Sequence, residues 1–293
     1  MRILITGALG QLGTELREVF GVDSHHEIIA TDAIAGPGDP ASKLDITDRD
    51  AVLSAITSTS PDAVIHPAAL TAVDRCEEEP DLAYAINAVG TRHVADAARI
   101  ASARVLYVST DYIFDGTKAS PYLEWDAPNP QSVYGASKLA GERELDPGST
   151  VVRTSWVCGR YGANMVKTIL RAADANPELK FVDDQRGHPT FASDLAAMIK
   201  TLVIERRPGT FHVTNQGAVS WHEFAQAVLE ADGQDPSRVL PISTDELQPP
   251  RPATRPANSV LDNAALRLSG IPLLPDFHEP LARTVAWLRD NPA

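Results

Sequence analysis

Cysteines, basic residues and long apolar runs are scarce in this chain. Its 293 residues include only two cysteines, Cys76 and Cys158. We therefore expect no disulfide framework, and we expect the protein to function in a reducing compartment. The net charge of -13 argues against binding to a nucleic-acid backbone. No apolar run reaches the roughly 18 residues of a membrane span, and "MRILITGALG" lacks the apolar region of a signal peptide. These absences predict a cytoplasmic protein without a nucleic-acid or membrane partner.

The chain does contain a regular alternation of short apolar runs and longer helical patterns. The runs rich in Val and Ile cover residues 2–6, 27–32, 62–69, 103–110 and 150–156. Helical patterns lie between them, for example over 48–58 and 83–102. Strands that alternate with helices predict an α/β fold with a doubly wound parallel sheet of the Rossmann type.

A glycine turn directly follows the first predicted strand. Gly7, Gly10 and Gly13 have the spacing G-x-x-G-x-x-G, at the point where a helical pattern begins. Glycine allows a tight turn and lets backbone N–H groups approach a pyrophosphate at a helix N-terminus. The turn therefore predicts a dinucleotide site, with the pyrophosphate beside Gly10, Gln11 and Leu12.

The second predicted strand ends at Asp32. About 20 residues beyond a glycine turn, a carboxylate commonly binds the adenosine ribose of NAD. The alternative is a solvated residue at the end of a strand. No arginine lies between Asp32 and Arg49 to bind a 2′-phosphate, which favours NADH without deciding between NADH and NADPH.

The segment "QSVYGASKLAGE", residues 131–142, has the pattern of a helix built mainly from small residues. Tyr134 and Lys138 are one turn apart and lie on the same side of such a helix. An ammonium group near a phenol is expected to lower the phenol's pKa, and such a tyrosine can give a proton to a ketone oxygen. The small residues 135–137 are expected to leave room for a flat cofactor. The alternative is an exposed Tyr and Lys on an ordinary helix.

A hydroxyl pair, Ser109 and Thr110, ends the predicted strand over 103–110. Ligands of doubly wound sheets bind beyond the carboxyl ends of the strands, which makes Thr110 a candidate for the same site. The alternative is a turn or helix-capping role.

The alternation weakens after about residue 157. Helical patterns continue over 162–174, 193–205 and 277–291, residues 209–214 resemble a strand, and 235–256 form a proline-rich stretch without a clear pattern. We predict a dinucleotide-binding domain and a smaller C-terminal substrate-binding lobe. The domain takes in residues 1–156, with 188–216 returning to it, and the lobe takes in 157–187 and 217–293.

Taken together, these segments resemble the extended short-chain dehydrogenase/reductase superfamily and, within it, the dTDP-4-dehydrorhamnose reductase family. The glycine turn and the Tyr-Lys segment are general to the superfamily, whereas "TAVD", "STDYIFDG", "RTSW" and "DQRGHPT" are more specific. The resemblance covers nearly the whole chain. It implies reduction of the 4-keto group of dTDP-4-dehydro-6-deoxy-L-mannose to dTDP-L-rhamnose with NADH or NADPH, and a catalytic set of Thr110, Tyr134 and Lys138.

The resemblance also implies roles for residues outside the catalytic set. Residues expected along the cofactor, besides Lys138 at the ribose, are Asp45, Ile46, Ala68, Ala69, Leu70 and Asn87. Residues expected on the sugar nucleotide are Thr110, Asp111, Tyr112, Trp156, Asn164 and Arg255. Trp156 could instead be a core aromatic and Arg255 a surface charge, and we expect Glu77 to Glu79 to form a solvated helix start.

The resemblance also bears on whether the protein binds a metal and forms a dimer. Some members of the family bridge a dimer with a metal held by acidic residues, and Glu15 matches one ligand. No convincing acidic partner is evident, so we expect no required metal. The resemblance allows a homodimer.

Two other classes of function stay open at this point. One is a related nucleotide-sugar epimerase or dehydratase, although many dehydratases carry an Asp-Glu pair where Asp111 and Tyr112 follow Thr110. The other is a non-catalytic regulatory subunit, like the β subunit of methionine adenosyltransferase, which has the same fold. Retention of Thr110, Tyr134 and Lys138 favours catalysis.

Overall fold

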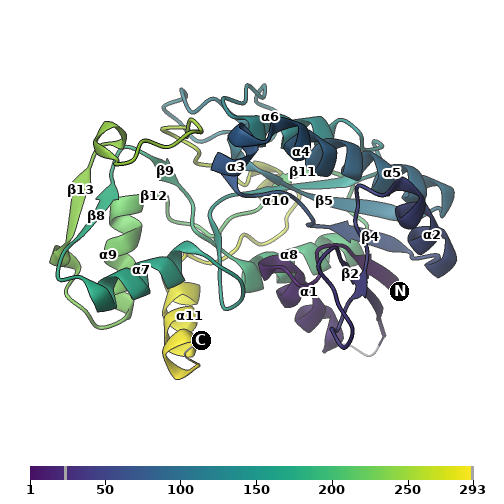
Figure 1. The fold of residues 1–293 in the computed structure, drawn as a ribbon, viewed down its shortest axis with the longest axis horizontal. Helices are drawn as coiled ribbons and strands as arrows, with labels where there is room; N and C mark the ends of the chain where they lie inside the picture. Colours follow the sequence, from purple (N-terminus) through teal and green to yellow (C-terminus); the bar gives the residue numbers. More distant parts are fainter. Residues whose placement is uncertain (23–24, 292–293) are drawn as a thin grey trace.

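A seven-stranded parallel sheet forms the centre of the computed structural model, which describes residues 1–22 and 25–291 (Figure 1). The strand order is β3-β2-β1-β4-β5-β6-β11. The strands are β1 (Arg2–Ile5), β2 (Glu27–Asp32), β3 (Ser42–Lys43), β4 (Ala63–His66), β5 (Arg104–Thr110), β6 (Thr150–Thr154) and β11 (Gly209–His212). The order changes direction between β1 and β4, and this is where doubly wound sheets bind their ligands.

Helices cover both faces of the sheet, as the alternating sequence predicts. α1 (Gln11–Gly21) and α8 (Ala192–Ile204) pack on one face, and α2 (Arg49–Thr59) and α5 (Thr91–Ile100) on the other. In β1, Ile3 and Ile5 enter the first of these cores while Leu4 enters the second. Strands buried on both faces read as continuous apolar runs, and the predicted fold class is confirmed.

The helix predicted over 83–102 is interrupted by a π-helical turn. α4 (Pro80–Tyr84) is followed by η1 (Ala85–Gly90) and then by α5. α3 (Val73–Glu78) precedes them, and α6 (Val133–Glu142) packs beside η1. Single π-helical turns are often found at functional sites, and this one carries Asn87.

A smaller lobe lies beside the sheet and has its own hydrophobic core. Its helices are α7 (Met165–Ala175), α9 (Trp221–Ala231) and α11 (His278–Asp290), and its strands β8 (Leu179–Val182) and β13 (Val239–Ile242) pair in parallel. Two further short strand pairs are β7 (Val157–Cys158) with β10 (Thr190–Phe191), and β9 (Arg186–Gly187) with β12 (Val219–Ser220), and Cys158, Phe191 and Val219 pack in the core of the lobe.

The proline-rich stretch is more ordered than its composition indicates. It holds η3 (Pro236–Arg238), β13 and η4 (Thr244–Glu246), with Pro241 inside β13. A two-stranded sheet consists of edge strands only, and an edge strand tolerates the missing N–H of proline. Further on, α10 (Ala264–Leu268) leads the chain back to the sheet, where Leu266, Ile271 and Leu274 enter the core of β1 and α8.

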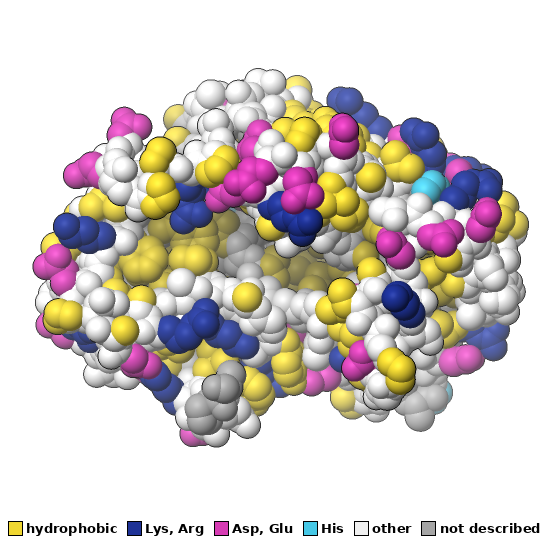
Figure 2. Space-filling view, viewed as in Figure 1, with side chains coloured by type: hydrophobic (Ala, Val, Ile, Leu, Met, Phe, Trp, Pro, Cys, Tyr) yellow, Lys and Arg dark blue, Asp and Glu magenta, His cyan; other side chains and the backbone are white. Residues whose placement is uncertain are grey.

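The surface is deeply hollowed between the lobe and the sheet domain (Figure 2). The floor of the hollow shows many apolar side chains, with basic and acidic groups on its rim. Within the described residues, no helix is both long and apolar enough to cross a membrane.

Candidate active site

The glycine turn after β1 has a geometry that only glycine can supply. Gly7 adopts a φ of +58°, and a Cβ on it would lie 2.9 Å from the Cα of Ala68. A Cβ on Gly13 would lie 2.1 Å from the carbonyl oxygen of Gly7. Gly10 precedes α1, whose first N–H groups have no side-chain cap in the described part of the chain. The positive end of this helix is therefore available to a phosphate.

Asp32 supports this turn from the end of β2. Its Oδ2 accepts a hydrogen bond of 2.9 Å from the N–H of Leu9, and its Oδ1 one of 3.1 Å from the N–H of Ile34. Asp32 is only 8% exposed, so it is not the solvated strand-end residue of the alternative interpretation. Each carboxylate oxygen can accept a further bond, and ribose binding stays a prediction.

The residues predicted further along the cofactor occupy two loops. Asp45 is exposed and accepts hydrogen bonds from the backbone and hydroxyl of Thr47. Ile46 is buried against Gly90, where an added Cβ would lie 2.9 Å from the isoleucine side chain. Ala68, Ala69 and Leu70 follow β4 and are half-buried.

Asn87 ties the loop after β4 to α6. Its Oδ1 accepts from the N–H of Leu70 at 2.8 Å, and its Nδ2 donates to the Leu70 carbonyl at 3.1 Å and to the Ser137 hydroxyl at 3.0 Å. The amide is 1% exposed. Asn87 therefore holds the backbone at Leu70 in place, and a cofactor would lie along this backbone.

Thr110, Asp111, Tyr112 and Tyr134 lie together at the carboxyl end of β5. The Thr110 hydroxyl donates to Asp111 Oδ1 at 3.0 Å, accepts from the N–H of Tyr112 at 3.2 Å, and also hydrogen-bonds the Tyr134 hydroxyl. The rings of Tyr112 and Tyr134 meet edge to face, with centroids 5.7 Å apart. Thr110 also caps the short helical turn that begins at Asp111, so the capping role and the proximity to Tyr134 coexist.

The electrostatics of Tyr134 differ from the expectation. Burial raises the pKa of the phenol, and the hydrogen bond with Thr110 offsets this only in part. Lys138 does not lower that pKa here, because its Nζ lies over the ring of Tyr107, 4.0 Å from the centroid. Burial lowers the pKa of Lys138 to about 7. Tyr134 is therefore protonated, which is the form that a proton donor needs.

Two glycines of α6 pack closely against the backbone of neighbouring segments. A Cβ on Gly135 would lie 2.1 Å from the carbonyl oxygen of Tyr112, and one on Gly141 would lie 2.3 Å from that of Asn87. The room expected for a cofactor beside Gly135 is filled by the chain itself. Glycine at these positions lets α6 pack directly against the segments that carry Tyr112 and Asn87.

On the sugar side, Trp156 and Asn164 connect the lobe to the sheet domain. Trp156 has a φ of +45° and its ring stacks on Trp221 with centroids 3.6 Å apart. Asn164 caps α7 and donates to the Gln11 side chain at 2.8 Å. Contacts of either residue with a sugar nucleotide stay predictions.

Arg255 is an internal ion-pair partner and not a free surface charge. Its guanidinium binds both oxygens of Asp74, at 2.5 and 2.8 Å, and its side chain is 11% exposed. Asp74 also accepts from the N–H of Ala253, and Arg255 hydrogen-bonds Tyr112. The proline-rich segment is thereby fastened beside the tyrosine pair.

The prediction of a solvated helix start is wrong for Glu77. Its Oε1 accepts a hydrogen bond of 2.7 Å from the N–H of Val133, the first residue of α6. Glu78 and Glu79 are exposed, as expected, but they lie at the end of α3 and not at its start, and Glu79 pairs with Arg75. The spacing of Asp74 and Glu77, three residues apart, places both on one face of a helix and was a signal in the sequence.

Three further residues escaped sequence reasoning because their partners are distant in the chain. Tyr107 lies under Lys138, Trp221 stacks on Trp156, and His66 bonds Thr6 at 2.7 Å and Thr91 at 3.2 Å. Buried aromatic residues in strands and helices usually form core contacts, so their types carried no functional signal.

The candidate metal ligand Glu15 is occupied by an arginine. Its side chain is 3% exposed, and both its oxygens bind Arg160, at 3.1 and 2.5 Å. Within residues 1–22 and 25–291, no group of three His, Cys, Asp or Glu side chains could hold a metal ion. That no metal is required stays a prediction.

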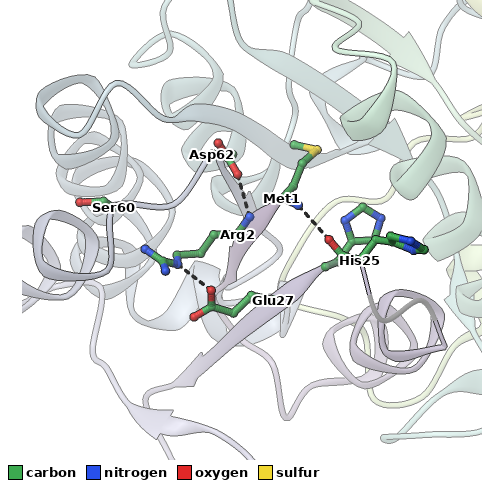
Figure 3. A pocket seen from close by; sticks show the side chains of 7 residues that line it. Met1, Arg2, His25, Glu27, Ser60 and Asp62 are labelled. Carbon is green, nitrogen blue, oxygen red and sulfur yellow. Dashed lines mark hydrogen bonds and ion pairs between the residues drawn. The ribbon is translucent and has the colours of Figure 1, made fainter.

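A second hollow lies at the other end of the strands (Figure 3). Met1, Arg2, Glu27 and Asp62 line it, at the amino ends of β1, β2 and β4. Arg2 binds Glu27 at 2.9 Å through its guanidinium and Asp62 at 2.7 Å through its backbone. Because ligands of doubly wound sheets bind at the carboxyl ends, we assign this hollow no part in the site.

Comparison with protein families tests the resemblance seen in the sequence. The family model for the RmlD substrate binding domain matches residues 1–289. The chain belongs to the RmlD family. The resemblance found in the sequence is thereby confirmed, over nearly the full length.

Similar proteins were found among curated proteins and solved structures. The dTDP-4-dehydrorhamnose reductase of Aggregatibacter actinomycetemcomitans is 41% identical over 273 residues, or 89% of this chain and 90% of the relative. The spore coat polysaccharide biosynthesis protein SpsK of Bacillus subtilis (strain 168) is 39% identical over 274 residues, or 92% of each chain. The crystal structure of dTDP-4-dehydrorhamnose reductase from Bacillus anthracis str. Ames, in complex with NADP, has a TM-score of 0.90 and 40% identity, covering 98% of this chain and 99% of that one.

Proposed function

We propose that this protein is an NAD(P)H-dependent dTDP-4-dehydrorhamnose reductase. It reduces the 4-keto group of dTDP-4-dehydro-6-deoxy-L-mannose to give dTDP-L-rhamnose, the last step of dTDP-rhamnose synthesis. The observation that carries this proposal is the meeting of Thr110 with a protonated Tyr134 at the strand ends, on the same helix as a buried Lys138. The family and its named reductases support the sugar nucleotide as substrate.

The described residues fit a nicotinamide dinucleotide. Lys138 is 2% exposed, and its Nζ has no hydrogen-bond partner within the described chain. A buried ammonium group without acceptors is unfavourable, and ribose hydroxyls would satisfy it. The turn of Gly7, Gly10 and Gly13 would hold the pyrophosphate, and Asp32 the adenosine ribose. When bound, the nicotinamide supplies the hydride.

The chain's own residues manage the proton and the orientation of the sugar. Tyr134 gives its proton to the former keto oxygen, and the neighbouring Thr110 hydroxyl helps to hold that oxygen by a hydrogen bond. Burial raises the pKa of Asp111 to about 6, while Thr110 and Ser259 hydrogen-bond the carboxyl and its Oδ2 is buried. This oxygen is suited to a hydroxyl of the sugar. Tyr112, Trp156, Asn164 and Arg255 complete the proposed substrate site.

The cofactor is NADH or NADPH. The sequence offers no arginine beside Asp32 for a 2′-phosphate, whereas the Bacillus anthracis relative was crystallised with NADP. We further propose that the protein is cytoplasmic and forms a homodimer. Light scattering of the purified protein measures its mass and tests the assembly independently of the activity.

One assay tests the proposed activity. Purified protein is offered dTDP-4-dehydro-6-deoxy-L-mannose with NADH and, separately, with NADPH, while the absorbance of the reduced nicotinamide and the sugar product are followed. Stoichiometric cofactor oxidation together with dTDP-L-rhamnose is expected. An altered sugar without net oxidation of the cofactor would indicate an epimerase. Absence of any turnover, together with recovery of a stoichiometric synthetase partner, would indicate a regulatory subunit.

A further inference from the structure

Tyr107 lies directly beneath the amino group of Lys138, in the centre of the molecule. We infer that Tyr107 is a positioning residue, whose ring face holds the Lys138 ammonium in its charged form and aims it at the ribose of the cofactor. The inference rests on the proposed function, since it concerns the same site. Tyr107 lies within β5, three residues before Thr110, and the sequence pattern gave it no role in the site.

The contact is a cation–π interaction in a dry environment. Nζ lies 4.0 Å from the ring centroid, Tyr107 is 0% exposed and Lys138 is 2% exposed. The electron-rich face of an aromatic ring attracts a cation most strongly when both are desolvated. The Tyr107 hydroxyl donates toward the carbonyls of Asn87 at 3.3 Å and Lys138 at 3.4 Å, which fixes the ring between η1 and α6.

The other charged and titratable groups around Lys138 do not replace the Tyr107 ring as the group that stabilises the lysine ammonium. On α6, Glu142 raises the lysine pKa, but its carboxylate is held by Arg153 at 2.8 and 3.0 Å, with both side chains under 9% exposed. On β4, His66 is neutral, because burial and the charge of Lys138 lower its pKa to about 3. Tyr134 on α6 has a raised pKa and is uncharged.

These surroundings leave the lysine close to losing its charge. Burial alone outweighs Glu142 and lowers the lysine pKa to about 7. A weaker ring face would lower it further, and a neutral amine binds ribose hydroxyls with fewer donors. The contact between the Tyr107 ring and Lys138 therefore affects the affinity for the cofactor and the highest pH at which the enzyme turns over.

A series of substitutions at position 107 separates the ring face from shape and from the hydroxyl. Tyr107→Phe keeps the face, phenylalanines with one, two or three ring fluorines weaken it at nearly constant shape, and Tyr107→Leu removes it. The lysine pKa of the cofactor-free protein is measured by NMR of ¹³C-labelled lysine, with Lys138→Arg to assign the signal. NADPH dissociation constants are measured by fluorescence over the same pH range.

We expect Tyr107→Phe to bind NADPH within about twofold of the parent. With each added fluorine the Lys138 pKa should fall stepwise, and NADPH binding above neutral pH should weaken, by about 10- to 30-fold in total for Tyr107→Leu. The alkaline limb of kcat/KM should move to lower pH in the same order. If Tyr107→Leu fails to fold, the fluorinated series decides alone.

A lysine pKa and NADPH affinity that do not respond to fluorination would overturn the inference, even if Tyr107→Leu lowers the melting temperature. That result would leave the proposed function intact wherever the parent still reduces the keto-sugar. Conversely, a parent that does not reduce the keto-sugar but whose lysine pKa and NADPH affinity follow the series would refute the proposed function and support the positioning role.

Discussion

Tyr134 illustrates how a single residue depends on its surroundings for its chemistry. The phenol is buried, hydrogen-bonded to Thr110 and uncharged, so its hydroxyl carries the proton that can be transferred. Its spacing from Lys138 could be recognised in the sequence, because four residues make one helical turn. The direction of its pKa shift could not, because it follows from burial that only the folded chain creates.

Replacing Tyr134 by Phe should remove the proton donor and little else. We expect kcat to fall by about 10²- to 10⁴-fold, the usual contribution of a general acid, while the NADPH dissociation constant changes by less than about twofold. Steady-state kinetics and cofactor fluorescence measure the two quantities. Tyr84→Phe, at an exposed tyrosine on α4, is the control. A Tyr134→Phe protein with parental kcat would refute the assignment.

Asp111 should make stability depend on pH in an unusual direction. Its pKa is raised to about 6 in the folded protein, from about 3.9 in the unfolded chain, so the folded state binds the proton more tightly. The stabilisation from this proton is complete below about pH 4 and is lost as pH rises through about 6, with a size of about 3 kcal/mol.

The substitution Asp111→Asn removes this titration. The free energy of unfolding of the variant, relative to the parent, should therefore increase by about 2–3 kcal/mol between about pH 4 and pH 8. Urea unfolding at several pH values measures this difference. A difference that stays constant with pH would show that Asp111 does not titrate in this way. Turnover should fall at every pH, since Asn cannot replace the carboxyl at the sugar.

At the scale of elements, α3 holds two parts of the site in place. Asp74 binds Arg255 in the proline-rich segment, and three residues later Glu77 binds the first N–H of α6. The sequence shows that these residues share a helix face, but it does not show what packs against that face. Both partners are distant in the chain, at 181 residues between Asp74 and Arg255 and 56 residues between Glu77 and Val133.

Loss of the Glu77 carboxylate should loosen the start of α6. Glu77→Ala leaves the N–H of Val133 without its acceptor, and we expect a loss of about 1–2 kcal/mol in unfolding free energy. Because Tyr134 is the next residue, kcat should fall by about tenfold. Glu77→Gln retains an acceptor oxygen and should recover most of the lost stability and kcat. Glu78→Ala, on the exposed face, should change neither the unfolding free energy nor kcat. Equal kcat in the Ala variants at 77 and 78 would contradict this role.

At the scale of the whole molecule, the sheet domain was far more predictable than the lobe. Strands buried on both faces, such as Ile3 to Ile5, carry an apolar signal that survives without tertiary information. The lobe's strand β13 contains Pro241 and is stabilised by pairing with β8, sixty residues away, so local pattern gave no sign of it. The site lies between the two parts, and its contacts across the hollow were correspondingly hard to predict.

Arg160 is one of the residues through which the lobe side of the hollow binds the first helix of the sheet domain. It neutralises Glu15, whose carboxylate is almost fully buried in α1, and it also contacts Glu18. Arg160→Ala would leave the Glu15 charge buried and unpaired. We expect a loss of about 2–4 kcal/mol in unfolding free energy, at the lower end of values for buried pairs because Arg160 is partly exposed.

The double variant Glu15→Gln with Arg160→Ala tests this explanation. Removing the stranded charge should recover at least half of the lost stability, whereas Arg171→Ala, at an exposed arginine on α7, should change it by less than about 0.5 kcal/mol. NADPH affinity should fall in Arg160→Ala, since α1 begins at the glycine turn and Gln11 is bonded to the carbonyl of Val157 beside the arginine. A double variant no more stable than Arg160→Ala would show that the arginine acts through packing and not through the charge of Glu15.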